Sequence, residues 1–318
     1  MDEFALIGRY FQSILHERTD VVLGIGDDAA CLQVPVDQQL LVSSDTLVAD
    51  VHFCQSWDAY DIAFKAVMVN VSDIAAMAGT PSWITLALTL PSYDESWLQR
   101  FSQGLHDALN RFNIALVGGD TTRGPLSMTL TIHGLVPTGK ALRRSGAKPG
   151  DKIYVSGEIG AAALAVSFLP AAHELDEADR RVLLEKLQHP HPRMDLVPYL
   201  QTYATAAIDI SDGLSADLNH LCVASHVGAC LDLESIPVHP LVKKHQGDNA
   251  LDFALRGGDD YELCFTVSPK HETLFLRDLE QAGLRCYFIG DIEVATGLKA
   301  KMKHGEINVL CTDGYRHF

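Results

Sequence analysis

The sequence predicts an α/β (α+β) protein built from two domains. Its 318 residues are enough for two hydrophobic cores. In both halves of the chain, apolar segments with strand-like alternation are interspersed with segments of helical periodicity. A polar stretch with a Pro149-Gly150 turn, residues 141–152, separates the halves. We therefore expect an N-terminal domain over residues 1–140 and a C-terminal domain over residues 141–318.

The first half begins with a helix and continues with a mixture of strands and helices. Apolar residues at helical spacing, from Phe4 to Leu15, predict an amphipathic helix over residues 2–16. A long helix over 58–78 ends at Gly79 and Pro81, and a second helix over 94–112 has Asp94 as its N-cap. Strands are expected at 20–25, 29–34, 39–48, 83–90, 113–119 and 127–137.

The second half shows the same mixture, which again favours an α/β or α+β arrangement. Helices are expected at 158–169, 176–187, 193–203, 214–226, near 249–256 and at 269–282. Strands are expected at 152–156, 205–210, 229–234, 261–267 and 285–290, with two short strands closing the chain.

The composition excludes several classes of function. A net charge of −16 argues against a nucleic-acid-binding surface, which needs a basic face. The start of the chain lacks the pattern of a signal peptide and no apolar run is long enough to span a bilayer, so we expect a cytoplasmic protein that binds no membrane. The 7 cysteines form no CxxC pair, which favours reduced thiols over a zinc site.

Acidic residues beside glycine or serine recur at six places and are the main functional signal. The segments are GIGDDA (24–29), SSDT (43–46), NVSDIAAMAG (70–79), GGDTTRG (118–124), DISDGL (209–214) and GGDDYE (257–262). Most of them follow an apolar, strand-like stretch, which suggests loops gathered around one site. Carboxylates brought together need a cation, and hard oxygen ligands favour Mg²⁺, Ca²⁺ or Mn²⁺. The pattern therefore predicts a multi-metal site that handles phosphate.

The six segments differ in how strongly they indicate a ligand. Asp73 is the strongest, because its helix is almost wholly apolar and shows no basic residue after Lys65. Asp45 also lies in a segment fit for a core. Asp28 fits a hairpin turn at least as well, and Asp212 is as well explained as a helix cap.

Two familiar phosphate-binding motifs are matched only in part. Gly24-x-Gly26-x-x-Ala29 follows the dinucleotide-binding pattern, but a strand-like segment stands where that motif needs a helix. Residues 134–140 follow a Walker A loop, but Ala141 replaces the hydroxyl residue that would hold Mg²⁺. For phosphate contacts the sequence offers instead the arginines at 123, 143 and 144, which a solvated linker would explain equally well.

Taken in order, the segments GIGDDAA, SSDTLV, NVSDIAAMAG, GGDTTRGP, RSGAKPGD, DISDGL and GGDDYEL resemble the thiamine-monophosphate kinase family, nearly from end to end. That family belongs to the aminoimidazole ribonucleotide synthetase-like superfamily. The resemblance implies a two-domain PurM-like fold, in which the N-terminal sheets of two subunits form a dimer barrel and a C-terminal α/β domain completes the active site. It implies a homodimer that phosphorylates thiamine monophosphate to thiamine diphosphate with ATP and several Mg²⁺.

The resemblance also implies roles for individual residues. The metal ligands would be Asp28, Ser43, Ser44, Asp45, Asp73, Asp120, Asp209 and Asp212. ATP would contact Gly119, Asp120, Arg144 and Ser211, and thiamine monophosphate would contact His52, Asp259 and Tyr315. Two positions depart from the family pattern: Ser44 stands where a threonine is usual, and Asp259 where a glutamate is usual, which shortens the reach of that carboxylate by one methylene.

The implied chemistry needs no general base. The acceptor is a phosphate monoester whose second pKa is about 6, so it is largely ionised at neutral pH. Phosphoryl transfer then depends on positioning and on neutralising charge, here by metal ions and Arg144. The alternatives are another ATP-dependent enzyme of the same superfamily and a non-catalytic cation-binding protein, although no EF-hand pattern is present.

Overall fold

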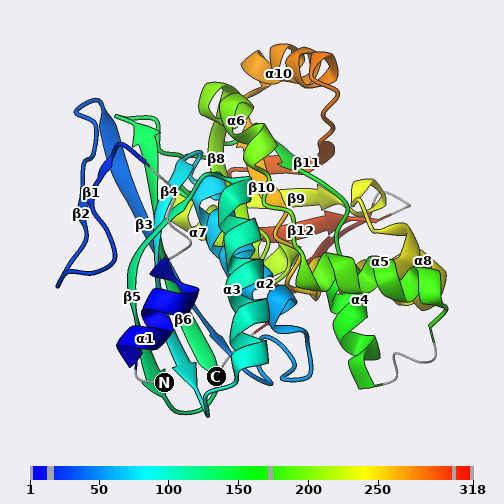
Figure 1. Cartoon of the computed structure of the whole chain (residues 1–318). Coiled ribbons are helices and arrows are strands. Elements are labelled where there is room, and N and C mark those ends of the chain that lie inside the picture. Colours follow the sequence, from blue (N-terminus) through cyan, green and yellow to red (C-terminus); the bar gives the residue numbers. More distant parts are fainter. Residues whose placement is uncertain (1–2, 13–17, 171–174, 303–305, 316–318) are drawn as a thin grey trace. The chain divides into compact units, whose positions relative to one another are not determined.

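The computed structural model describes residues 3–12, 18–170, 175–302 and 306–315 (Figure 1). The chain forms two compact units. Unit 1 comprises Met1–Ile74 and Gly79–Ala141, and unit 2 comprises Ala75–Ala78 and Leu142–Phe318. In the described ranges no helix combines the length and the apolar character that crossing a membrane requires.

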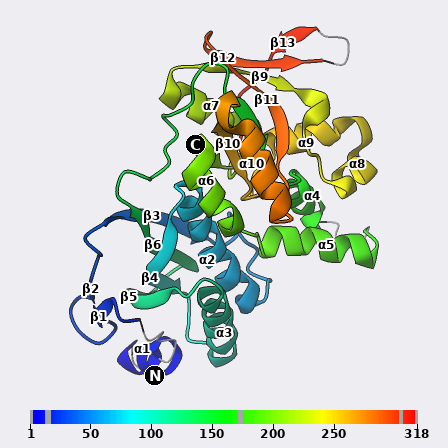
Figure 2. The same cartoon turned by 90° about the horizontal axis from the view of Figure 1, so that it is seen from above.

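Unit 1 is built on a four-stranded mixed sheet in the order β3-β6-β4-β5, in which only β4 and β5 run parallel. Helices α2 and α3 lie on one side of the sheet and the β1–β2 hairpin on the other (Figure 2). The elements are α1 (Glu3–Tyr10), β1 (Val21–Leu23), β2 (Cys31–Leu32), β3 (Gln38–Val48), α2 (Ala59–Ala76), β4 (Thr80–Leu90), α3 (Glu95–Arg111), β5 (Ala115–Arg123) and β6 (Ser127–Pro137).

The local signals explain most of these elements. Asp94 caps α3 as predicted, because its carboxylate accepts a hydrogen bond from the Trp97 amide at 3.1 Å. The predicted strand–turn–strand around the first acidic segment is present as the β1–β2 hairpin, which packs against buried Trp83. The predicted helix over 2–16 is seen as α1, while residues 13–17 lie outside the described residues.

The fourth acidic segment is not a loop, contrary to the sequence-based expectation. Strand β5 continues through it to Arg123, with Gly119 paired to Leu86 and Asp120 paired to Ala87 of β4. Gly119 has a φ of 156°, and a Cβ atom there would lie 1.9 Å from the Leu86 carbonyl oxygen. Only glycine allows this approach, so the Gly-Gly pair extends the strand instead of ending it.

Unit 2 is built on a seven-stranded mixed sheet in the order β13-β12-β9-β11-β7-β10-β8, in which only β12 and β9 run parallel. Its core includes Tyr154, stacked on Phe265 at 5.9 Å. The elements are β7 (Lys152–Val155), α4 (Ala161–Phe168), α5 (Glu177–Gln188), η3 (Met194–Leu196), α6 (Val197–Tyr203), β8 (Ala204–Asp209), α7 (Leu214–Ser225), β9 (Gly228–Asp232), η4 (Leu233–Ser235), α8 (Pro240–Gln246), η5 (Gly247–Asn249), α9 (Ala250–Arg256), β10 (Leu263–Val267), α10 (Pro269–Gln281), β11 (Tyr287–Glu293), β12 (Gly297–Lys301) and β13 (Ile307–Val309).

Two differences from the predicted elements concern short segments. Helix α8 was not predicted, since Leu241 and Val242 are adjacent in its sequence PLVKKHQ and give no helical periodicity of apolar residues. Strand β10 starts at Leu263 and not at Tyr261, because Asp259 and Tyr261 have φ values of 68° and 51°, which no strand accommodates. The last acidic segment therefore remains a loop.

Candidate functional site

Strand β3 and helix α2 bring two predicted ligands into direct contact in unit 1. The Ser43 hydroxyl donates a hydrogen bond to Asp73 Oδ2 at 2.5 Å. Burial, and next the adjacent Asp73 carboxylate, raise the pKa of Asp45 to about 6. Ser43 and Asp45 project from the same face of β3, because side chains two residues apart point the same way. Two carboxylates held this close repel each other unless a cation neutralises them.

The position of Asp73 within α2 strengthens this argument. Asp73 lies in the last turn, where the helix carries a partial negative charge and where α2 has no basic residue. Asn70, one turn earlier, is fully buried, and its side-chain amide donates to the Ala66 carbonyl at 2.9 Å. Within the described residues its Oδ1 atom has no hydrogen-bond partner. The end of α2 thus presents oxygen atoms suited to a hard cation.

Ser44, the neighbouring predicted ligand, directs its hydroxyl elsewhere. This hydroxyl lies 3.0 Å from the Thr131 hydroxyl and 3.2 Å from the Leu130 carbonyl of β6. Because adjacent residues of a strand point to opposite faces, the Ser44 side chain does not accompany those of Ser43 and Asp45.

A cavity of about 650 Å³ in unit 1 gathers three further predicted residues of that unit, Asp28, Gly119 and Asp120. Residues 24–30, with Asp28, form one wall, and Gly119 and Asp120 of β5 form another. The apolar side chains of Ile7 and Phe11 also line it. Across the sheet, Gly119 lies level with Asp45 through the paired residues of β4 and β6, three strand spacings or roughly 14 Å away.

The predicted multi-metal site is not preassembled in this part of the chain. Within the described ranges, no three His, Cys, Asp or Glu side chains converge as a metal site. The structure brings together Asp45 and Asp73, and separately Asp28 and Asp120 at the cavity. The donors are of the kind that Mg²⁺ prefers, and the full ligand set stays a prediction.

His52 lies in the turn that follows β3. Its Nδ1 atom accepts a hydrogen bond from the Val48 amide at 3.0 Å. In the neutral ring this contact assigns the proton to Nε2, so His52 can present an N–H donor from a half-buried position.

Three predicted segments of unit 2 are held together by main-chain hydrogen bonds. The Asp259 amide donates to the Ser211 carbonyl at 2.9 Å, and the Tyr315 amide donates to the Asp212 carbonyl at 3.1 Å. Asp209, which is buried, ends β8 one residue before this loop starts. The structure therefore places Ser211, Asp212, Asp259 and Tyr315 side by side, although they are far apart in the sequence.

The buried carboxylate of Asp217 holds the loop between β8 and α7 in place. Asp217 Oδ2 accepts hydrogen bonds from the amides of Ser211 and Asp212, both at 3.0 Å. Burial raises the pKa of Asp217 to about 7. The N-cap of α7 is Gly213, so Asp212 is not the helix cap that the sequence also allowed. The Asp212 carboxylate therefore does not cap α7.

The two adjacent aspartates of the last acidic segment have different surroundings. The Asp260 carboxylate accepts from the Gly160 amide at 3.0 and 2.8 Å and so holds the start of α4. Asp259 adopts the left-handed backbone conformation, and its amide donates to the Ser211 carbonyl. The sequence could not choose between the two, and the contact with Gly160 gives Asp260 a structural role.

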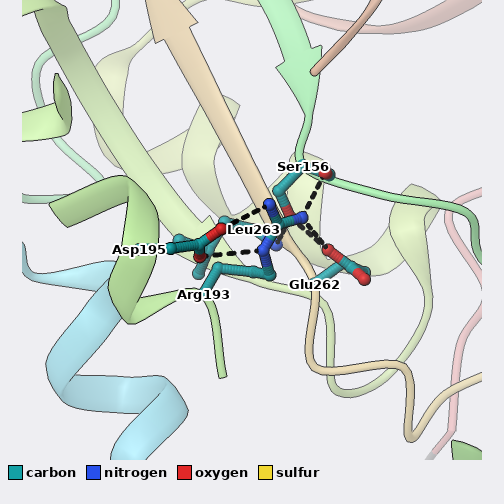
Figure 3. Close-up of polar contacts among 5 residues, drawn as sticks. All are labelled: Ser156, Arg193, Asp195, Glu262 and Leu263. Carbon is teal, nitrogen blue, oxygen red and sulfur yellow. Dashed lines mark hydrogen bonds and ion pairs between the residues drawn. The ribbon is translucent and has the colours of Figure 1, made fainter. Parts of the chain in front are cut away.

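Glu262 anchors the same segment to a buried arginine (Figure 3). Its carboxylate accepts from the Ser156 hydroxyl at 2.5 Å and from Arg193 Nη1 at 3.0 Å. Arg193 also forms a two-pronged ion pair with Asp195, at 3.1 and 3.0 Å. The Leu263 amide donates to the Ser156 hydroxyl at 2.7 Å, which completes the network.

These supporting residues were missed by sequence reasoning. Arg193 lies 69 positions from Glu262, and no local pattern pairs them. Asp217 falls within a helix, where a carboxylate reads as an ordinary surface residue. Arg144, which was predicted, is exposed in the segment that follows the start of unit 2.

Comparison with protein families defines the class of this protein. The family "AIR synthase related protein, N-terminal domain" matches residues 26–136, and "AIR synthase related protein, C-terminal domain" matches residues 148–303. The chain is 46% identical to thiamine-monophosphate kinase of Escherichia coli K12, over 99% of this chain and 98% of that protein. It is 34% identical to the Bacillus subtilis enzyme of the same name over the full length of both. The chain belongs to the thiamine-monophosphate kinase family.

Solved structures agree with this assignment. Thiamine-monophosphate kinase from Stenotrophomonas maltophilia K279a superposes with a TM-score of 0.87 at 43% identity, over 96% of this chain and 98% of that one. AaThiL complexed with AMPPCP and TMP superposes with a TM-score of 0.79 at 30% identity, over 99% and 97%. The resemblance seen in the ordered acidic segments is confirmed, as is the two-domain α/β fold with mixed sheets.

We predict that Asp45→Asn stabilises the metal-free protein at pH 8. A carboxyl group whose folded pKa is about 6, above its unfolded value, makes folding less favourable as the pH rises through this range. Removing its charge should raise the free energy of unfolding by about 1–3 kcal/mol at pH 8 and by almost nothing at pH 4. Thermal unfolding in EDTA at both pH values measures this.

The exposed carboxylate of Asp37, changed to Asn, is the matched control and should leave Tm unaltered at both pH values. An Asp45→Asn protein that melts at or below the wild-type temperature at pH 8 would contradict the repulsion between Asp45 and Asp73.

We also predict that Arg193→Met strongly destabilises the protein, by about 3–5 kcal/mol, because it leaves the buried Glu262 carboxylate without its cation. The double variant Arg193→Met/Glu262→Leu should recover a large part of that loss, since the buried charge is then removed and Asp195, the other partner of Arg193, is exposed to water. Urea unfolding of both variants measures the difference. Equal stability of the single and double variants would show that the ion pair does not carry the network.

Proposed function

We propose that this chain transfers the γ-phosphoryl group of ATP to thiamine monophosphate, giving ADP and thiamine diphosphate. The observation that carries the proposal is its full-length similarity to thiamine-monophosphate kinases, one of which binds AMPPCP and TMP. Hydrogen bonds from other parts of the chain also hold several of the acidic segments that carry the resemblance.

Charge neutralisation is the main task in this reaction, because two polyanions must meet. The proposed Mg²⁺ ligands in unit 1 are Asp28, Ser43, Ser44, Asp45, Asp73 and Asp120, and those in unit 2 are Asp209 and Asp212. The Asp45–Asp73 pair supports a cation most directly, since its two half-buried carboxylates repel each other when both are ionised. When bound, Mg²⁺ supplies positive charge at the phosphate oxygens. For Ser44 the main-chain carbonyl is the proposed ligand atom, because its hydroxyl contacts β6.

The two substrates would use different groups of residues. Gly119 and Asp120 at the cavity of unit 1, with Arg144 and Ser211 of unit 2, are the proposed ATP contacts. His52 can donate a hydrogen bond from its Nε2–H group to the acceptor phosphate. Asp259 and the half-exposed ring of Tyr315 suit the cationic thiazolium. No residue is needed as general base, since the acceptor oxygen is already ionised.

The two domains would divide the work. We assign ATP and Mg²⁺ binding and dimerisation to residues 1–140, and completion of the active site to residues 141–318. All seven cysteines are free thiols, which supports the cytoplasm as the location.

A homodimer is the proposed assembly, with the sheets of two N-terminal domains joined into a barrel. The exposed edge of β3 supports this. This strand is an edge strand of its sheet. The side chains of Leu40 and Val42, on the open face of the strand, are 44% and 58% exposed. It carries neither proline nor lysine, the residues that usually protect an edge from pairing.

The activity is tested with purified protein, ATP, Mg²⁺ and either thiamine or thiamine monophosphate. We expect ADP and thiamine diphosphate with the monophosphate only. Asp45→Asn and Asp73→Asn should each lower kcat by about 10²-fold or more, because charge stabilisation in the transition state is lost. Asp37→Asn should keep wild-type turnover. Phosphorylation of free thiamine, or no ADP formed with the monophosphate, would refute the assignment.

The assembly is tested by sedimentation of wild-type protein and of Val42→Lys. We expect a wild-type dimer and a Val42→Lys monomer, since a charge on an edge strand opposes pairing with a second copy. Val294→Lys, which changes a valine of unit 2 that is more exposed than Val42, is the control and should remain dimeric. A monomeric wild-type protein at micromolar concentration would exclude the barrel.

A further inference from the structure

One hydroxyl group holds the main chain around Arg144. Ser225 Oγ donates a hydrogen bond to the Arg144 carbonyl at 2.7 Å. The same oxygen accepts from the amides of Gly146 and Ala147 at 3.0 and 3.2 Å. A hydroxyl has one donor and two acceptor positions, so Ser225 uses its full hydrogen-bonding capacity on this segment.

The opposite side of the segment is fixed by strand β8. The Ala207 amide donates to the Arg143 carbonyl at 3.2 Å. A Cβ atom on Gly146 would lie 2.0 Å from the Thr205 carbonyl oxygen, so only glycine allows the segment to lie this close to the strand. The main chain of Arg144 is therefore held between β8 and the end of α7, while its side chain is exposed to solvent.

Helix α7 supports a second predicted nucleotide contact at its other end. Ser225 is its last residue, and Asp217 in its first turns holds the amides of Ser211 and Asp212. Twelve residues of α-helix span about 18 Å. One rigid element thus fixes both of the segments of unit 2 that carry proposed ATP contacts.

We propose that Ser225 is a positioning residue for ATP binding, which acts by fixing the main chain from which the Arg144 guanidinium projects. This inference rests on the proposed function. Arginine recognises phosphate through a planar two-pronged contact, so a small rotation of its main chain misaligns both prongs. Ser225 lies near the surface, where water can replace the lost hydrogen bonds without restoring the geometry. Removal of the hydroxyl should therefore weaken nucleotide binding more than folding.

The experiment compares Ser225→Ala, Ser225→Thr and the control Ser167→Ala. Ser167 is a helix hydroxyl of the same unit that bonds only to Leu164 of its own helix among the described contacts. We expect Ser225→Ala to raise KM for ATP about 5- to 20-fold, with KM for thiamine monophosphate within about 2-fold of wild type. Ser225→Thr, which keeps the hydroxyl, should restore KM for ATP, and Ser167→Ala should behave as wild type.

A double-variant cycle tests whether the effect passes through Arg144. In the Arg144→Ala background, Ser225→Ala should raise KM for ATP no further, because the side chain that Ser225 positions is absent. Ser225→Cys keeps the size of the side chain with much weaker hydrogen bonding, and it should also raise KM for ATP. If Ser225→Ala lowers Tm, the KM for ATP of Ser225→Cys tests the positioning role in its place.

The outcomes separate the inference from the proposed function. Wild-type protein without thiamine-monophosphate kinase activity refutes the function. Active wild-type protein together with an unchanged KM for ATP in Ser225→Ala and Ser225→Cys refutes the positioning role. An equal rise in KM for both substrates in Ser225→Ala also refutes the role. So does a double variant in which the fold-increases in KM for ATP caused by Ser225→Ala and Arg144→Ala multiply.

Discussion

The contact between Asp45 and Asp73 is the constraint on which the functional interpretation depends. Strand β3 and helix α2 are both well-formed elements, and their packing forces two carboxylates together at the negative end of a helix. This arrangement does not stabilise the fold, because two apolar side chains would pack at the same place with a smaller free-energy cost. The arrangement becomes favourable when a divalent cation is shared between the two side chains. The cation proposed here would attract a nucleotide to a protein whose net charge otherwise repels it.

The carboxylates of unit 2 divide into two kinds that serve opposite purposes. Asp217, Asp260 and Glu262 are turned toward main-chain amides or toward Arg193, and their role is to hold loops in place. Asp212 and Asp259 lie on those same loops, and their main chains are fixed by their neighbours. A loop held in this way costs little further entropy when a ligand binds. The buried carboxylates thus prepare the loops on which the proposed ligand-binding carboxylates stand.

The sequence predicted the order of nearly all helices and strands, because periodicity and caps are local signals. It also identified the acidic segments, since charged residues inside apolar stretches are conspicuous. The sequence-based prediction failed where contacts between residues far apart in the chain determine the structure. Asp120 and the residues after it read as a loop, yet β5 continues through them, because Gly119 allows a close approach to Leu86. Asp260 and Asp259 look equivalent in the chain, and only the contact of Asp260 with Gly160 distinguishes them. Ser43 and Ser44 likewise look equivalent until the alternation of β3 turns them to opposite faces.

The supporting residues also indicate how Arg144, a proposed phosphate contact, is held in place on an irregular segment. Residues 143–147 form neither helix nor strand, so no regular hydrogen-bond ladder fixes the main chain around Arg144. Ser225 and the Ala207 amide take over that task from the two sides. Because α7 is anchored at one end by Asp217 and at the other by Ser225, a shift of this helix would move the segments of Ser211 and Arg144 together. The spacing of the two proposed ATP contacts in unit 2 is therefore set by the length of a helix and not by the flexibility of two loops.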